Sequence, residues 1–187
     1  MKNKSSRNYR CQGNAGRSRA RESVNAAFVG LSYKEGMKAL DSRTTTGSMI
    51  DEVVSGLSGV ECWRTNLVDR VLFDNQGRLR NPTAYEIGQC FSRFEERVRK
   101  RRPRIVVTLG ALTSKHILNR LAGTSFAGWA GLLNYVPIET ANTVFIAAHH
   151  PSHIAVYRRR ERREYVAALR EAITGALEGT FPLGEFA

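Results

Sequence analysis

The stretch RPRIVVTLGALTSKHIL, residues 102–118, joins an apolar run to an amphipathic segment through one glycine. Its first part, RPRIVVTLG, is rich in β-branched residues and ends at Gly110, which is typical of a buried strand that leads into a turn. The segment ALTSKHILNRLAG that follows is predicted to be a helix. A phosphate-binding loop is a weak interpretation of this glycine, because TLGALTSK lacks the spaced glycines and the Gly-Lys-Ser/Thr of such loops. Gly110 is better explained as permitting a tight turn between the strand and the helix.

The same alternation of strand and helix continues in both directions from this stretch. The predicted strands are residues 25–32, 60–68, 102–110 and 142–152, and the predicted helices are residues 48–59, 81–102, 111–123 and 158–177. Most of the strands are continuously apolar, which is typical of parallel strands buried on both faces. We expect an α/β protein, with three α/β/α layers around a central, mostly parallel four-stranded sheet. Residues 1–22 are predicted to be a flexible basic arm, and residues 23–187 a single domain.

The charge balance narrows the class of partner. The chain has 29 Lys and Arg against 17 Asp and Glu, a net charge of +12. Such an excess favours a polyanion, above all nucleic acid. No apolar run approaches the roughly 20 residues that span a bilayer, and the N-terminus lacks the apolar region of a secretory signal. Three widely spaced cysteines, Cys11, Cys62 and Cys90, argue against a disulfide framework, so we expect a reduced, cytoplasmic protein without membrane contact.

The ends of the predicted strands are the places to look for a site. In open parallel sheets, ligands bind at the carboxyl ends of the strands. Four segments should therefore converge in space: Gly30–Tyr33, Thr65–Asn66, Leu109–Gly110 and His149–Ser152.

The last of these segments lies near the start of AAHHPSHIAVYRRRERREYV, residues 147–166, where histidines are followed by a run of arginines. A metal site is a poor interpretation, because no carboxylate or cysteine lies at ligand spacing nearby. A catalytic imidazole delivered to a DNA backbone and a solvated surface helix after a turn are the other two interpretations. His149 and His153 are more readily explained as packed or solvated residues.

Five motifs occur together in the order and spacing of a known family: FVGLS, RTNLV, NPTAYEIGQC, RPRIVVTLGALTSKHIL and HHPS. Over residues 26–170 the chain resembles the uracil-DNA glycosylase superfamily, most closely its thermophile-type branches. The resemblance implies a monofunctional DNA glycosylase. Such an enzyme flips a base out of the duplex and hydrolyses its N-glycosidic bond, leaving an abasic site.

The resemblance also implies roles for individual residues. His150 matches the histidine of the family's His-Pro-Ser motif and is expected to donate a hydrogen bond to the base as it leaves as an anion. Asn66 matches the asparagine that reads the Watson–Crick edge of a flipped pyrimidine. The base pocket is expected to be shaped by the first motif: Gly30, Leu31, Ser32 and Tyr33.

The segment after His-Pro-Ser matches the part of the family that enters the minor groove. Ser152 is available as a helix cap, and Ile154, Val156 or Tyr157 could wedge into the gap left by the flipped base. The arginines expected to hold phosphates are Arg158, Arg159, Arg160, Arg162 and Arg163. On a continuous helix, Arg159, Arg162 and Arg163 would share one face. The expected partner is duplex or single-stranded DNA, bound by a monomer.

The first motif departs from the family pattern Gly-Glu-Ala-Pro-Gly or Gly-Leu-Ala-Pro-Ala. Leu31 resembles the second version, whose members act without the carboxylate. The nearest carboxylates that could orient water are Glu35 and Asp41, and Asp69 is another. The family's stacking Pro-Phe is missing from ALDSRTTTG, residues 39–47, although Tyr33 could replace the ring.

The cysteines depart as well. The thermophile-type branch usually holds a four-cysteine iron–sulfur cluster, and here Cys90 matches one ligand position and Cys11 a second. Three thiols cannot fill a four-thiolate site, so we expect no cluster, no other cofactor and no metal. Cys90 is better explained as a small buried hydrophobe.

The departures fall on the parts that make a uracil pocket tight. Relatives act on uracil, hydroxymethyluracil, hypoxanthine and bulky modified pyrimidines of phage DNA. The altered pocket favours a modified and bulky pyrimidine over plain uracil, in DNA repair or in anti-phage defence. The alternative is a non-catalytic DNA-binding module on the same fold.

Overall fold

The computed structural model describes residues 24–129 and 131–180, so the predicted basic arm and Cys11 lie outside the described residues. Its sheet has five strands in the order β2-β1-β3-β5-β4. The strands are β1 (Val24–Gly30), β2 (Val60–Asn66), β3 (Ile105–Leu109), β4 (Pro137–Glu139) and β5 (Val144–Ala148). The first three and β5 run parallel, with Gly30 paired to Asn66 and Leu109 to Ala148. These pairs bring the carboxyl ends of the parallel strands to one edge.

The prediction of four strands is wrong by one. The fifth strand, β4, pairs antiparallel with β5 at the edge of the sheet. It has three residues and begins with Pro137. A proline lacks the N–H needed inside a sheet and is accepted at the start of an edge strand. Such a short run leaves little periodic signal in a sequence.

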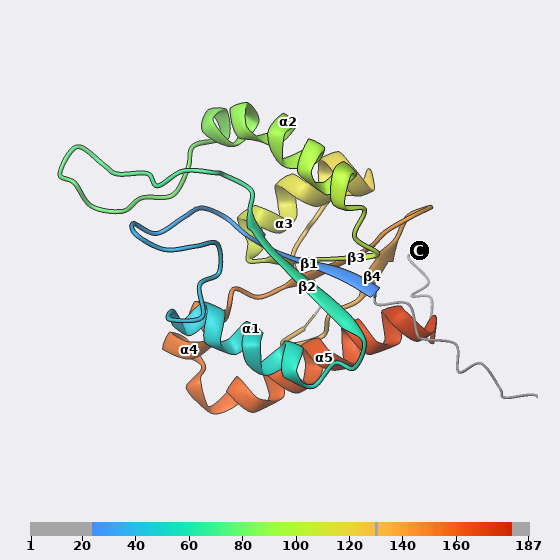
Figure 1. Ribbon diagram of the computed structural model, residues 1–187. Coiled ribbons are helices and arrows are strands. Elements are labelled where there is room, and N and C mark those ends of the chain that lie inside the picture. Colours follow the sequence, from blue (N-terminus) through green and yellow to red (C-terminus); the bar gives the residue numbers. More distant parts are fainter. Residues whose placement is uncertain (1–23, 130, 181–187) are drawn as a thin grey trace, which may run out of the picture.

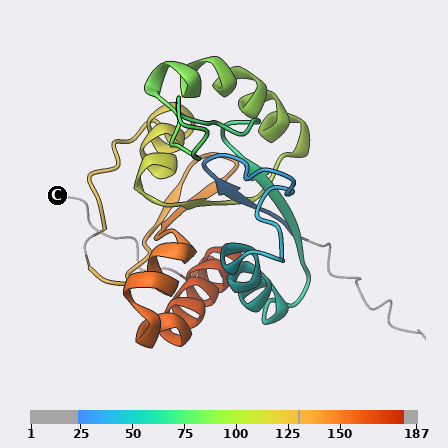
Figure 2. The same cartoon turned by 90° about the vertical axis from the view of Figure 1, so that its left-hand side faces the viewer.

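Helices cover both faces of the sheet, as Figures 1 and 2 show, and this confirms the three-layer α/β/α class. The helices are α1 (Thr45–Ser55), α2 (Ala84–Arg101), α3 (Ala111–Ile117) with a π-helical turn (Leu118–Ala122), α4 (Pro151–Tyr157) and α5 (Arg162–Glu178). On one face, α2 and α3 pack over the sheet; on the other lie α1, α4 and α5. Within the described ranges, no helix is both long enough and apolar enough to cross a bilayer.

The two faces of each parallel strand feed two separate cores. Phe28 and Val107 point into the core beneath α1 and α5, whereas Val29 and Val106 point into the core beneath α2 and α3, and all four are fully buried. This arrangement explains why the strands are continuously apolar instead of alternating.

The predicted helix over residues 158–177 is also corrected. The segment after His150 forms a separate short helix, α4, and a 3₁₀ turn at Arg159–Glu161 joins it to α5. Helix α4 begins at Pro151, whose fixed backbone suits the first helical position. The predicted strand over residues 142–152 therefore ends earlier, at Ala148, and Pro151 and Ser152 belong to α4. A helix of seven residues carries too little periodicity to be recognised in the sequence.

Candidate active site

The ends of the four parallel strands converge on one cavity of about 670 Å³. This confirms the expected meeting of the strand ends, which supply Gly30, Asn66, Leu109 and His150 to the wall. The rest of the lining comes from the loop after β1, the start of α1, the segment before α2 and the start of α3. Those residues are Leu31, Ser32, Tyr33, Lys34, Met37, Lys38, Leu40, Asp41, Thr44, Thr46, Leu79, Arg80, Asn81, Gly110, Ala111, Leu112 and Thr113.

Gly30 and Asn66 lie side by side at the ends of β1 and β2. A Cβ on Gly30 would stand 2.5 Å from the Asn66 carboxamide oxygen and 3.0 Å from Leu40 Cδ2. Glycine is therefore required here because the asparagine side chain lies across the end of β1. The backbone continues this contact, since the Leu67 N–H donates to the Gly30 carbonyl at 2.9 Å.

Asn66 is 2% exposed and its side chain faces the cavity. The backbone carbonyl oxygen of Asn66 accepts a hydrogen bond from Arg97 Nη2 at 3.0 Å, which fixes the main chain at this residue. Among the described residues, none forms a hydrogen bond with the carboxamide itself. The carboxamide atoms are not among the buried polar atoms that lack a partner, so they face the open space of the cavity, where a ligand would supply both a donor and an acceptor for them.

His150 lies at the end of β5, against Gly110. A Cβ on Gly110 would stand 3.3 Å from His150 Cβ, and the φ of +93° at Gly110 is a conformation that L side chains rarely adopt. His150 is the N-cap of α4: its Nδ1 accepts hydrogen bonds from the Ser152 N–H at 3.3 Å and lies 2.7 Å from Ser152 Oγ. The histidine therefore performs the capping role that was predicted for Ser152.

These contacts assign the tautomer of His150. A backbone N–H can only donate, so Nδ1 is the unprotonated nitrogen and Nε2 carries the hydrogen. Burial, with Lys34 and His153 as positive neighbours, lowers the pKa of His150 from 6.5 to about 4. The imidazole is consequently neutral at pH 7 and has one donor, Nε2–H, available for the cavity that it lines.

The lowered pKa predicts how stability changes with pH. Between pH 4 and 6.5 the unfolded chain binds a proton at His150 that the folded chain does not, so the free energy of unfolding falls as the solution is acidified. The expected loss is about 3 kcal/mol, at about 1.36 kcal/mol per pKa unit. We expect His150→Asn, which keeps a capping acceptor, to lose less stability over this range in denaturant titrations. Equal losses in both proteins would contradict the prediction, since His116 and His149 also have lowered pKa values and are common to both.

The neighbouring His149 is held away from this role by aromatic contacts. Its ring stacks on Trp129, with centroids 3.8 Å apart and planes at 20°, and its Nδ1 lies 3.2 Å from the Tyr135 hydroxyl. Trp129 Nε1 donates to the Ala147 carbonyl at 2.7 Å. These contacts fix the end of β5, and His149 is not part of the cavity lining.

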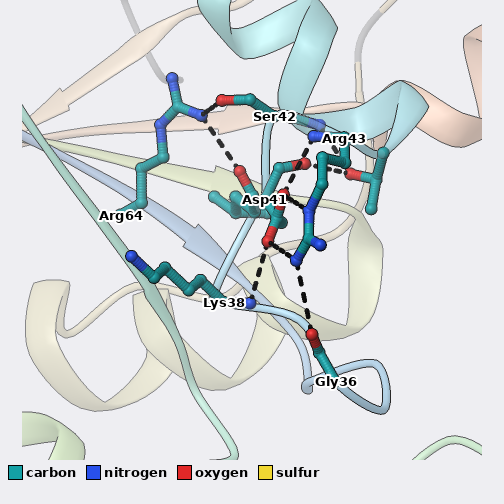
Figure 3. Close-up of polar contacts among 9 residues, drawn as sticks. Gly36, Lys38, Asp41, Ser42, Arg43 and Arg64 are labelled. Carbon is teal, nitrogen blue, oxygen red and sulfur yellow. Dashed lines mark hydrogen bonds and ion pairs between the residues drawn. The ribbon is translucent and has the colours of Figure 1, made fainter.

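The loop between β1 and α1 is held by a polar network, shown in Figure 3. The Asp41 carboxylate accepts hydrogen bonds from Arg43 N and Nε, both at 3.0 Å, from Arg43 Nη2 at 2.9 Å and from Lys38 N at 3.2 Å. Arg64 Nη1 reaches from β2 to the Leu40 carbonyl at 3.1 Å and to Ser42 Oγ at 3.2 Å. The network holds buried Leu40 at a φ of +49°, an uncommon value for a residue with a side chain.

The three carboxylates that were predicted to orient the attacking water, Glu35, Asp41 and Asp69, lie in different places. Glu35 is exposed and is not part of the cavity lining. Asp41 lines the cavity, but the hydrogen bonds from Arg43 hold the pKa of its carboxyl well below the usual range, which makes it a weak base. Asp69 lies 3.4 Å from Arg93 Nη1 and 3.9 Å from Arg97 Nη1, outside the lining. Tyr33, proposed as a substitute ring, is half-buried in the wall.

Helix α4 separates the residues that were predicted to touch DNA. Ile154 is fully buried in the core beneath α1 and α5, so its prediction as a wedge is wrong. Val156 and Tyr157 are 57% and 76% exposed. The His153 ring lies 5.1 Å from that of Tyr157, which gives α4 an exposed aromatic pair beside the cavity wall formed by His150.

The arginines after α4 do not form one helical face, because the 3₁₀ turn interrupts the chain. Arg162 forms an ion pair with Glu52 and so joins α5 to α1. Arg158 lies 3.3 Å from Glu161. Arg159, Arg160 and Arg163 are exposed, and Arg159 Nε donates to the Ala155 carbonyl at 3.1 Å.

Sequence reasoning missed one wall of the cavity, formed by Leu79, Arg80 and Asn81. These residues precede α2 in a segment without strong periodicity. The one available signal was Leu79, an apolar residue in the otherwise polar run NQGRLRN.

The described cysteines do not fit an iron–sulfur cluster. Cys62 packs against the core beneath α1 and α5, and buried Cys90 lies in the core beneath α2 and α3, so the sheet separates their thiols. A cluster requires four thiolates around one centre. The part of the chain that the structure describes contains no group of three His, Cys, Asp or Glu side chains placed to bind a metal ion.

Comparison with known proteins agrees with the motifs and the geometry. The model of the uracil DNA glycosylase superfamily matches residues 16–174. The chain belongs to the uracil-DNA glycosylase superfamily. This membership supports a DNA glycosylase, a hydrolase that acts on DNA, as its kind of function.

Among solved structures, the wild-type SMUG2 of Pedobacter heparinus matches with a TM-score of 0.57 and 14% identity. The match covers 83% of this chain and 76% of that one. At this identity the likeness shows the fold alone. A search of curated proteins found no match to the sequence.

Proposed function

We propose that the protein is a monofunctional DNA glycosylase that removes a modified and bulky pyrimidine from DNA. One observation carries the proposal: the neutral imidazole of His150 and the unpartnered carboxamide of Asn66 line the same cavity. A flipped base in this cavity would meet a hydrogen-bond donor for its developing charge and an amide for its edge.

The chemistry assigned to these groups is heterolysis of the bond between the base and the sugar. The bonding electrons leave with the base, and His150 Nε2–H stabilises the resulting anion through a hydrogen bond. Water then adds to the oxocarbenium-like sugar, and the proton that it loses ends on the departed base anion, which leaves an abasic site and the neutral free base. We assign Asp41 to holding the loop after β1 instead of activating this water, because Arg43 and Lys38 occupy its oxygens.

The size of the cavity supports a bulky base. The volume of about 670 Å³ includes the open mouth of the cavity. It lies within the range of about 300–1,000 Å³ for pockets that hold drug-sized ligands, so a base larger than one pyrimidine ring has room. Apolar Met37, Leu79 and Leu112 line it beside the polar groups. The choice between DNA repair and defence against modified phage genomes depends on which base is released.

The test is a panel of duplexes that differ in one base: uracil, hydroxymethyluracil, hypoxanthine and pyrimidines with large substituents at C5. Each is incubated with the protein and heated in alkali, which breaks the strand at abasic sites. We expect breaks at a bulky modified pyrimidine at a higher rate than at uracil. Binding without breaks on every duplex would favour a non-catalytic DNA-binding module, and faster breaks at uracil would reject the bulky base.

Contacts outside the cavity should affect DNA binding without changing which base is removed. Replacing Arg159 or Arg160 with alanine is expected to reduce the slope of log affinity against log salt by about 0.9 for each lost phosphate contact.

Tyr157→Ala should instead slow base release from duplex more than from single strands, because a wedge is needed only where neighbouring bases are stacked. Arg104, an exposed arginine directly before β3 at the edge of the sheet opposite the cavity, provides a control. Unchanged slopes and an unchanged duplex-to-single-strand ratio would exclude this surface from the DNA path.

A further inference from the structure

Residues 71–80, between β2 and α2, form a β-ribbon that projects beyond the sheet (Figure 1). Phe73 pairs antiparallel with Leu79, and the Asp74 N–H donates to the Arg78 carbonyl at 2.8 Å. The Asp74 carboxylate closes the turn by accepting from the N–H groups of Gln76 at 2.8 Å and Arg78 at 2.9 Å. The ribbon is therefore held in one shape by its own hydrogen bonds.

The base of the ribbon is attached to α2. Arg80 donates to both Glu86 carboxylate oxygens, at 2.8 and 2.7 Å, and its Nε donates to the Phe73 carbonyl at 3.0 Å. Glu86 in turn completes the capping box of α2 with Thr83. This two-point contact between a guanidinium and a carboxylate fixes orientation as well as distance, so the ribbon stands at a defined angle to the body.

One face of the ribbon is apolar. Directly paired residues of antiparallel strands project their side chains to the same face, so Phe73 and Leu79 share a face. Buried Leu72 packs into the core beneath α2, and neighbouring residues of a strand alternate; the Phe73 side chain therefore points away from that core. Phe73 is 41% and Leu79 55% exposed. Because Leu79 lines the cavity, this apolar face adjoins the cavity mouth.

We propose that Phe73 and Leu79 form a stacking platform for a nucleobase next to the base that enters the cavity. The proposal rests on the proposed function, since a DNA strand that delivers a base to the cavity must pass its mouth. Exposed Lys34 and Lys38 line the same cavity and are suited to the phosphates of that strand. Aromatic side chains beside a basic groove are the usual means of binding unstacked bases.

The position of the ribbon relative to α4 supports a nucleobase as the partner of Phe73 and Leu79. The ribbon is joined to α2 on one face of the sheet, whereas α4 packs with α1 on the other, and Figure 2 looks onto the edge between them. The cavity lining includes Leu79 from the ribbon and His150 at the N-cap of α4, so the cavity lies between the ribbon and the start of α4. Two side chains form too small a patch for a stable protein interface of about 800 Å² per partner, but they match the size of one base.

The test measures DNA binding separately from base release. The probes are a single-stranded oligonucleotide and a matching duplex, each with uracil and with fluorescent 2-aminopurine beside it. Wild type is expected to change the 2-aminopurine signal on binding, and Phe73→Ala to lose that change and to bind the single strand about 5- to 150-fold more weakly, the loss of one stacked base. Phe73→Trp should restore both. Leu132→Ala removes a residue of similar exposure to Leu79 outside the cavity lining and should behave as wild type, whereas Leu79→Ala should weaken binding.

The outcomes separate this inference from the proposed function. If wild type binds neither probe, the platform is wrong, and the proposed function is judged on the panel of duplexes. If wild type binds but Phe73→Ala keeps both the signal change and the affinity, the platform is wrong while the glycosylase proposal stands. A dimer of the wild-type protein that Phe73→Ala dissociates, with DNA binding unchanged, would reassign the face to a second copy of the chain. Equal thermal unfolding of the variants excludes misfolding, since Phe73 is exposed.

Discussion

Replacing His150 with alanine is expected to slow base release by about 100- to 1,000-fold while DNA affinity stays nearly unchanged. Loss of one preorganised donor to a developing anion typically has this effect. The donor is preorganised because Ser152 holds Nδ1 and leaves the hydrogen on Nε2. Single-turnover rates on the preferred base of the panel measure the effect on the chemical step alone.

Two controls identify the group responsible. His149→Ala removes a histidine that stacks on Trp129 outside the cavity, so it should slow release much less than His150→Ala. Ser152→Ala removes the hydroxyl 2.7 Å from Nδ1 and keeps the backbone donor. Without the hydroxyl the neutral form of His150 is less favoured, so its pKa rises and the acid limb of the rate profile moves to higher pH. An unchanged rate in His150→Ala would exclude it from the reaction.

The convergence of the strand ends could be predicted because it depends only on topology. Continuous apolar runs indicated parallel strands, and parallel strands bring their carboxyl ends to one edge. Gly30, Gly110 and His150 come at the ends of such runs, whereas Asn66 ends the mixed run VECWRTN, and all four line the cavity. The prediction did not require these residues to be close together along the chain.

The failures arose where a short segment depends on tertiary contacts. Nothing in PSHIAVY separates exposed Tyr157 from buried Ile154 until α4 packs against α1. The sequence predicted that Asp41 could orient water, because nothing in it shows that the carboxylate has a partner. In the structure the loop after β1 turns so that Arg43 reaches that carboxylate. The π-helical turn after α3 and the edge strand β4 are likewise defined by backbone hydrogen bonds, which leave no regular pattern of side chains.

Asn66 raises a different question, because its side chain was expected to read a base and its carboxamide meets no partner among the described residues. A site that hydrogen-bonds its substrate can reject analogues by factors of about 10⁴–10⁵, since the wrong analogue leaves buried groups unpaired. Asn66→Ala removes those groups. We expect the variant to lose most of the difference in rate between bases that have the same size and different hydrogen-bonding edges, and to release the preferred base at least about 10-fold more slowly.

Gly30→Ala tests the same role without altering Asn66. The added Cβ would stand 2.5 Å from the carboxamide oxygen and displace it, so this variant should lose discrimination in the same direction. Gly88→Ala is the matched control, because a Cβ there meets only Arg120 Nη2 at 3.9 Å and lies on α2. The measurement is the ratio of single-turnover rates for two such bases in all four proteins. If Asn66→Ala and Gly30→Ala keep the wild-type ratio, Asn66 supports the turn after β2 and base selection must come from the wall formed by Leu79, Arg80 and Asn81.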